Sequence, residues 1–181
     1  MAEALHVPLE AGEIRLVPLT EGHREALREA CAADAEIWAI YPMSLVGDGF
    51  DPGFAAMLAT PGRAAFAVLK ADELVGTTSY LGIAPADAAL EIGGTYIMPA
   101  VRGTGLNRTC KQLMIDHAIA CGYRRIEFRV DTRNRRSMAA VAKLGAVQEG
   151  VLRRNRTTWT GYVRDTAIFS LLAEEWAEGR R

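Results

Sequence analysis

A glycine-rich segment at residues 96–108 holds the residue types and spacing best suited to chemistry in this chain of 181 residues. It reads as the end of a strand, a bend at proline, a loop and the start of an amphipathic helix. Gly103 and Gly105 have no Cβ atom, so a bulky anion can approach the N–H groups of the loop. The helix N-terminus adds partial positive charge at the same point. The segment therefore predicts a phosphate-binding loop.

Two familiar phosphate-binding motifs differ from this segment at the end of the loop. A nucleotide P-loop requires lysine and then serine or threonine after its last glycine, and this chain has Leu106 and Asn107 there. A dinucleotide fingerprint requires a small residue where this chain has Arg108. Glu127 lies about 20 residues further on, at the distance expected of an acid that binds ribose. The dinucleotide interpretation is therefore weakened and stays open.

Four motifs follow one another in order along the chain. Residues 91–96 read as a central strand that leads into the loop, and residues 131–137 contain an Asn-x-x-Ser pattern that continues to Lys-Leu-Gly-Ala at 143–146. Residues 164–171 read as a closing strand. Together with the loop, these motifs resemble the GNAT superfamily of N-acetyltransferases, and within it the Rim-type branch. The resemblance covers roughly residues 12–176.

The resemblance implies one α/β (α+β) domain over residues 1–181, with its core at about 12–176. Such a domain has a mixed, mostly antiparallel sheet of about seven strands, flanked by helices, with two central strands splayed apart where the cofactor enters. The element order expected from hydrophobic periodicity, β-α-α-β-β-β-α-β-α-β-β, agrees with this arrangement. The expected strands are 12–19, 64–70, 74–81, 90–98, 125–130, 147–154 and 162–172.

The resemblance also implies acetyl-CoA as cosubstrate, with its pyrophosphate on the loop and its pantetheine arm beside the preceding strand. The Ile97 N–H would polarise the thioester carbonyl. Asn134 and Ser137 lie three positions apart and face one way, although Asn134 could equally serve only as a helix cap. The residues expected to bind acetyl-CoA are Tyr96, Ile97, Met98, Arg102, Gly103, Thr104, Gly105, Leu106, Asn107, Arg108, Asn134 and Ser137.

Amine acetylation needs a group that removes a proton from the amine and a group that protonates the departing thiolate. Glu91 is the candidate base, because the Rim-type branch often carries an acid on the central strand, although Glu91 could simply be exposed at a strand start. Ser137 is the first candidate acid and Tyr123 the second. Aromatic residues are the candidate walls of an acceptor site, and each could instead belong to the core: Trp38, Tyr41, Phe50 and Trp159.

Composition is that of an ordinary globular protein, with 50% hydrophobic residues, 24% charged residues and a formal net charge of −1. No overall field attracts such a chain to nucleic acid or to an acidic membrane. Two arginine groups, at 124–136 and 153–156, have too few interleaved aromatic residues to stack bases, with only Tyr123 and Phe128 near the first. They are expected on the solvated surface, or where the coenzyme 3′-phosphate or a ribosomal partner docks. No nucleic-acid or membrane partner is expected.

Cysteine and histidine usage predicts a reducing compartment and no metal. Cys31, Cys110 and Cys121 are odd in number and form no C-x-x-C pair, which is typical of a cytoplasmic protein. Residues 1–13 lack the pattern of a secretory signal. No spacing of histidine, cysteine and acidic residues matches a metal site.

The predicted function is transfer of an acetyl group from acetyl-CoA to a primary amine, either a protein N-terminus or a small-molecule amine. The amine would attack directly in a ternary complex, without a covalent enzyme intermediate. Rim-type relatives are often dimers, so the resemblance also implies a possible homodimer. The alternatives are a non-catalytic acyl-CoA-binding or regulatory module of the same fold, and a nucleotide-binding oxidoreductase. The sequence identifies neither the acceptor nor the preferred acyl length.

Overall fold

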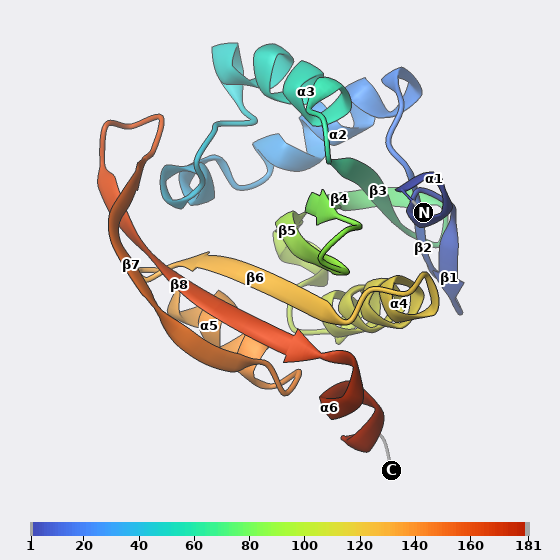
Figure 1. Ribbon diagram of the computed structural model, residues 1–181. Helices are drawn as coiled ribbons and strands as arrows, with labels where there is room; N and C mark the ends of the chain where they lie inside the picture. Colours follow the sequence, from blue (N-terminus) through green and yellow to red (C-terminus); the bar gives the residue numbers. More distant parts are fainter. Residues whose placement is uncertain (1, 180–181) are drawn as a thin grey trace.

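Eight strands form one sheet within residues 2–179, the part of the chain that the computed structural model describes (Figure 1). They are β1 Leu9–Ala11, β2 Ile14–Pro18, β3 Ala64–Lys70, β4 Glu73–Ala84, β5 Ala89–Ile97, β6 Arg125–Asp131, β7 Val147–Thr157 and β8 Val163–Leu172. Their order is β1-β2-β3-β4-β5-β6-β8-β7, and only β5 and β6 are parallel neighbours. The expected mixed, mostly antiparallel sheet is confirmed. The strand missing from the expectation is β1, whose three residues are too few to show alternation.

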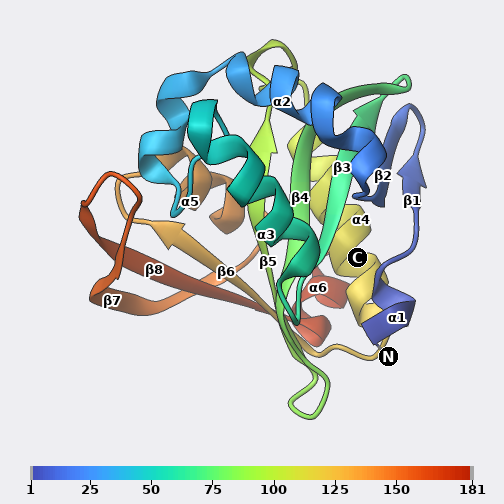
Figure 2. The same cartoon turned by 90° about the horizontal axis from the view of Figure 1, so that it is seen from above.

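Helices cover both faces of the sheet. In Figure 2, α2 and α3 cross one face, whereas α4 runs along the other. The α-helices are α1 Ala2–Leu5, α2 Arg24–Ala32, α3 Phe50–Ala59, α4 Leu106–Ala120, α5 Arg135–Ala142 and α6 Ala173–Glu178. Short 3₁₀ turns are η1 Glu21–His23, η2 Ala35–Ile40, η3 Gly47–Gly49 and η4 Pro99–Val101. No helix among the described residues is long and apolar enough to cross a membrane.

The sheet separates two apolar cores. Along β3, Phe66 and Val68 face α4, while Ala65 and Ala67 face α2 and α3, as the alternation of a strand requires. The core on the α4 side also takes in Leu5 from α1, which is fully buried. The sheet is thus covered on both faces, and its strands are held in a fixed frame for the residues at their ends.

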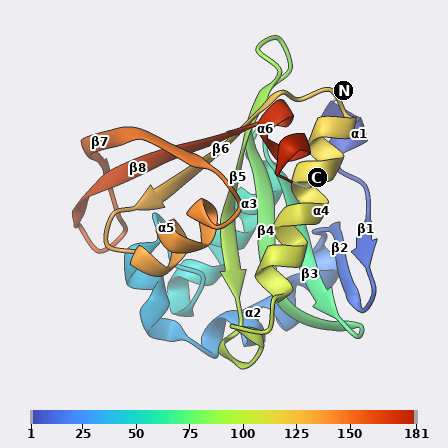
Figure 3. The same cartoon turned by 90° about the horizontal axis from the view of Figure 1, so that it is seen from below.

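The central strands β5 and β6 separate soon after they pair (Figure 3). Their register has only three pairs, the last of which is Glu91 with Glu127. Beyond this pair, residues 92–97 of β5 have β4 on one side and no strand on the other. The backbone groups on that edge are therefore left without ladder partners, and the expected splay is confirmed.

A β-bulge in β5 falls within this unpaired segment. The register with β4 passes from Ser79 opposite Gly93 to Thr77 opposite Tyr96, so Gly94 and Thr95 together face a single residue of β4. Gly94 has a φ of 56°, a left-handed conformation that favours glycine. The bulge changes the direction of the β5 backbone in the segment that no longer pairs with β6.

Candidate active site

The loop before α4 is open on its outer side. Gly103 and Gly105 have φ values of 79° and 90°, and a Cβ placed on either would meet no atom within 4 Å. Glycine is thus needed at both positions for backbone conformation, and it also leaves the approach to the loop free. Leu106 is buried and anchors the start of the helix in the core.

The N-terminus of α4 has no side-chain cap and no acidic residue in its first turn. A helix of 15 residues therefore presents free N–H groups and its positive dipole end at the loop. The Asn107 Oδ1 atom is buried there without a hydrogen-bond partner among the described residues. Arg108 is exposed in the same turn. The free N–H groups, the helix dipole and the Arg108 cation fit a bound pyrophosphate, whereas the Asn107 Oδ1 atom is an acceptor and would need a donor.

Arg102 faces the protein rather than the opening of the loop. Its Nε donates to the Ile97 carbonyl at 2.7 Å, and its Nη1 pairs with the Asp34 carboxylate at 2.5 Å. Thr104 donates from its hydroxyl to the Val101 carbonyl at 2.8 Å. Both side chains thereby hold the loop in shape. Their binding of acetyl-CoA stays a prediction, and it would be made mainly by their backbone N–H groups.

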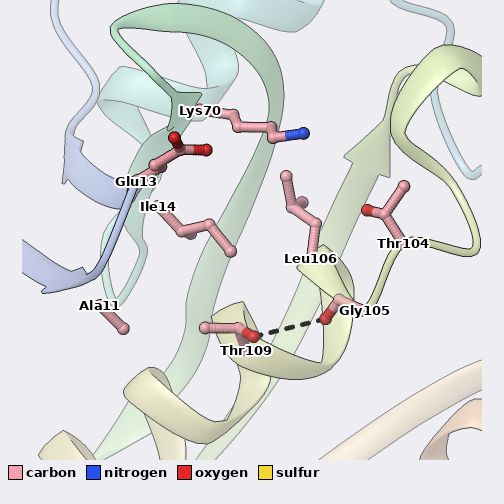
Figure 4. A pocket seen from close by; sticks show the side chains of 8 residues that line it. All are labelled: Ala11, Glu13, Ile14, Lys70, Thr104, Gly105, Leu106 and Thr109. Atoms are coloured by element: carbon pink, nitrogen blue, oxygen red, sulfur yellow. Dashed lines mark hydrogen bonds between the residues drawn. The ribbon is translucent and has the colours of Figure 1, made fainter.

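A hollow of about 230 Å³ lies beside the loop (Figure 4). Its lining comes from the β1–β2 turn, the end of β3 and the start of α4, with Lys70 extending over Leu106. None of its lining residues belongs to β5 or β6. The hollow is therefore not where the pantetheine arm is expected, although Lys70 adds a cation near the loop.

The end of β5 carries the three residues expected beside the pantetheine arm. Tyr96 and Ile97 are buried, and Tyr96 donates from its hydroxyl to the Ala30 carbonyl at 2.7 Å. Met98 donates its N–H to the Val75 carbonyl at 2.8 Å, so that N–H is already in use. Main-chain pairing with a ligand would therefore centre on Tyr96 and Ile97.

Glu91 occupies the vertex where β5 and β6 part. Its side chain is 19% exposed and lies 3.6 Å from Arg129 Nε. A Cβ on Gly93 would come within 2.6 Å of the Glu91 carboxylate, so glycine there makes room for it. Burial raises the pKa of Glu91, and the charges of Arg129 and Arg156 partly oppose that rise. A carboxyl group with a raised pKa at this point has the properties of a general base.

Asn134 and Ser137 lie at the start of α5, which packs beside β6 (Figure 3). Asn134 caps the helix, because its Oδ1 accepts from the Ser137 N–H at 3.0 Å. The capping interpretation is therefore confirmed, and contact with the coenzyme stays a prediction. The Tyr123 hydroxyl is buried without a hydrogen-bond partner among the described residues, and burial raises its pKa, which makes it a poor acid at neutral pH.

The expected acceptor residues come together next to β5, with one exception. Trp38 and Tyr41 have ring centroids 4.8 Å apart, and Trp159 Nε1 donates to the Trp38 carbonyl at 2.7 Å. The Tyr41 hydroxyl donates to the Thr95 carbonyl in the bulge at 2.6 Å. Phe50, in α3, is fully buried in the same apolar core as Trp38 and stacks on Phe54 with ring centroids 5.7 Å apart. Trp38 is also buried, so the accessible side chains of this group are those of Tyr41 and Trp159.

Several arginines of the first group, residues 124–136, form ion pairs with acidic side chains. Arg125 binds Glu127 and Glu149, Arg129 binds Glu127, and Arg133 binds Asp131. These pairs agree with the solvated-surface interpretation of the group. Across residues 4–179, whose side chains the structure describes, no cluster of histidine, cysteine and acidic residues is arranged to bind a metal.

Comparison with known proteins decides the family. The family described as acetyltransferase (GNAT) domain matches residues 13–147. The chain belongs to the GNAT acetyltransferases. As a member it transfers acetyl groups from acetyl-CoA. The sheet order also removes the dinucleotide interpretation, since β5 and β6 form the single parallel pair in the described sheet.

Solved structures support the same assignment. A candidate acetyltransferase from T. thermophilus is 34% identical, with a TM-score of 0.87 and coverage of 95% of this chain and 92% of that one. A GNAT-family candidate from Chromobacterium violaceum is 31% identical, with a TM-score of 0.88 and coverage of 95% and 94%. Mycobacterium smegmatis RimJ, solved with CoA-disulfide, shares the fold at 23% identity, a TM-score of 0.79 and coverage of 93% and 87%. No curated protein matches the sequence.

Lys111 is a residue of this region that the sequence interpretation did not select. It lies on α4, is only 6% exposed, and donates from its ammonium to the Thr95 hydroxyl in the bulge. The sequence does indicate that Lys111 is buried, because position 111 lies on the same helical face as Met114 and Ala118, and that face is buried. A lysine on that face is unusual enough to mark a site.

Proposed function

We propose that this GNAT acetyltransferase acts on a primary amine and belongs with the Rim-type N-acetyltransferases. The acceptor is a protein N-terminus or a small-molecule amine, and it attacks acetyl-CoA directly in a ternary complex. The observation that carries the proposal is the position of Glu91. It is a carboxyl group of raised pKa at the point where β5 loses β6 as a neighbour.

Glu91 acts as the base, directly or through a water molecule, and takes one proton from the attacking amine. The unpaired edge of β5 binds the pantetheine arm as an added strand would, and the uncapped end of α4 holds the pyrophosphate. Ser137, in the first turn of α5, is the proposed proton donor to sulfur. Most of the rate comes from holding amine and thioester together.

The acceptor enters from the side of α2 and α3, where Tyr41 and Trp159 flank the buried Trp38. Aromatic side chains at this position suit an aliphatic or peptide group that follows a terminal amine. Rim-type proteins share the fold at 23% and 16% identity, which supports the architecture and leaves the acceptor to be measured.

The test is thermal unfolding with acetyl-CoA, CoA, NAD⁺ and ATP, followed by thiol release across a panel of short peptides, polyamines and aminoglycosides. Saturating acetyl-CoA at about 100 times its dissociation constant should add about 2.7 kcal/mol of apparent stability. Thiol release that depends on one class of amine supports the proposal and names that class.

Two results would contradict the proposal. Stabilisation by acetyl-CoA without thiol release on any peptide or small amine would favour a non-catalytic acyl-CoA-binding module. Release of thiol with hydroxyl acceptors alone would assign the enzyme to a different acceptor chemistry.

A further inference from the structure

Lys111 places a positive charge inside the protein beneath the bulge of β5. Its Nζ donates to the Thr95 hydroxyl at 2.5 Å and to the Thr78 hydroxyl at 3.3 Å. These two hydroxyl groups are 2.8 Å apart and belong to the residues that face each other across the bulge. Lys111 therefore binds β4 and β5 at the place where their register changes.

The ammonium is not neutralised by a carboxylate. Among residues 4–179 no acidic side chain forms an ion pair with Lys111, and its two hydrogen-bond acceptors are neutral hydroxyl groups. The Glu91 carboxylate acts on the ammonium only through space. An ammonium has three N–H donors, so one of them has no acceptor among the described residues. Burying a charge in this way is costly unless something else compensates it.

Asn107 supplies a second, independent observation on the same face of α4. It precedes Lys111 by four residues, which places the two side chains one turn apart. Its Oδ1 is buried and has no hydrogen-bond partner among the described residues. Two polar groups with unused hydrogen-bonding capacity thus lie one turn apart on α4, and Lys111, the second of them, lies beneath the bulge of β5. A ligand placed there would satisfy both.

Resting on the proposed function, we propose that Lys111 is a positioning and charge-stabilising residue of acetyl transfer. Its ammonium favours the negative charge that forms on the coenzyme sulfur, and its bonds to Thr78 and Thr95 hold the bulge that lines the reaction site. Asn107 accepts a hydrogen bond from an amide N–H of the pantetheine arm. The sulfur of acetyl-CoA is thereby the partner of a charge that the protein leaves unpaired.

The charges balance in this step. The amine nitrogen forms a bond to the carbonyl carbon of the thioester, the C–S bond breaks, and its electron pair leaves on sulfur as thiolate. The amine gives one proton to Glu91. An ammonium in a site that excludes water stabilises the new anion far more than it would in solution. The thiolate takes up a proton as it leaves, either directly from solvent or through Ser137, which recovers its own proton from solvent at the same time.

The environment of Lys111 gives the proposal a pH signature. Burial lowers the pKa of Lys111 to about 8, and the neighbouring Cys110 thiol and the Glu91 carboxylate oppose this decrease. Below pH 8 the ammonium form predominates, and above it the neutral amine does. The contribution of Lys111 to the rate should therefore be complete at pH 7 and decrease as the pH rises through about 8.

The test uses Lys111→Met, with Lys143→Met as a matched control, because Lys143 is exposed at the end of α5. We expect Lys111→Met to lower kcat for the amine by about 10²-fold, while the acetyl-CoA dissociation constant changes by less than about threefold. The ratio of wild-type to variant kcat should decrease toward one above pH 8. Lys143→Met should leave kcat and the pH profile unchanged.

A second readout does not need turnover. The pKa of the thiol of bound CoA is followed by thiolate ultraviolet absorbance, with the desulfo-CoA complex as reference. We expect a value below that of free CoA in the wild-type protein, and an increase of at least about one unit in Lys111→Met. This measurement tests Lys111 even if no acceptor in the panel reacts, so failure of the proposed function and failure of this inference are distinguishable.

Three results would overturn the inference. The first is a bound-CoA thiol pKa in the wild-type protein at or above that of free CoA, which needs no variant to fold. The second is a Lys111→Met protein that binds acetyl-CoA and keeps wild-type kcat. The third is an equal loss of kcat in Lys143→Met, which would show that the effect does not depend on the buried position.

Discussion

The Glu91 side chain is largely buried and lies near arginine side chains. Burial and the arginine charges shift its pKa in opposite directions. Burial is the larger influence and raises the pKa, while Arg129 and Arg156 lower it. An acid whose folded pKa is above its unfolded pKa binds more protons in the folded state, so stability decreases as pH rises through the two values. The charged form present at neutral pH therefore destabilises the fold, as is common for groups at functional sites.

Glu91→Gln tests both consequences. We expect kcat to decrease by about 10²–10⁴-fold, because the general base is removed. In the wild-type protein kcat/KM should decrease at low pH through the raised pKa of Glu91, and the variant should lack this decrease. Glu91→Gln should also raise the midpoint of thermal unfolding at pH 7, with the difference vanishing at acid pH.

Glu127→Gln is the control for this prediction, because Glu127 is the residue opposite Glu91 in β6 and binds Arg125 and Arg129. It should keep the low-pH decrease in kcat/KM. If Glu91→Gln retains both the rate and the pH profile of the wild-type protein, another group removes the proton.

The loop before α4 depends on backbone conformation rather than on space. At Gly105 a Cβ would touch nothing within 4 Å, yet φ is 90°. Gly105→Ala should therefore destabilise the protein by about 1–2 kcal/mol through left-handed strain alone. It should also weaken acetyl-CoA binding, because the loop relaxes away from its shape. Denaturant unfolding and calorimetric titration with acetyl-CoA measure the two effects.

Gly150→Ala in β7 is the matched control, since Gly150 has equally open surroundings and no positive φ. We expect no loss of acetyl-CoA affinity there. Equal losses of stability in the two variants would show that the conformation of Gly105 is not what the loop requires.

Hydrophobic periodicity predicted the strands and helices that are long enough to repeat a pattern. It located β3 and β4 on either side of the turn expected at residues 71–73, because alternation and turn residues are local properties. It did not predict that the Asp51 carboxylate, in the first turn of α3, binds Arg24 and Arg28 of α2, because these ion pairs join distant segments and no local pattern contains them.

The site could be predicted from the sequence only in part. The loop, Glu91 and the start of α5 were found because each lies within a short motif. Lys111 and the bulge at Thr95 were not, since a bulge arises from the pairing of two strands and a buried cation from packing of a helix on a sheet. The contact of His6 Nε2 with the Ala65 carbonyl at 2.8 Å likewise joins distant segments, so no local pattern predicts it.

The arrangement of the whole sheet makes one strand edge available for a ligand. Saturating acetyl-CoA should slow hydrogen exchange at amides in residues 92–97 of β5 that face away from β4. At about 100 times the dissociation constant, slowing of about 100-fold is expected. Amides of β3, which pairs with β2 and β4, are the internal reference and should change little. Uniform slowing across the sheet, with no excess in β5, would contradict binding at that edge.

The hydrogen bond from Trp159 to Trp38 connects the β7–β8 turn to η2, on opposite sides of the gap between β5 and β6. Starting at Thr95, the contacts run through Tyr41 and Trp38 to Trp159 in the β7–β8 turn, and return through β8 and β6 to Glu91. Strands β5 and β6, which separate beyond Glu91, are therefore joined again at their far ends through Tyr41, Trp38 and Trp159. The hydrogen bond from Trp159 to Trp38 thereby limits how far the two strands can move apart.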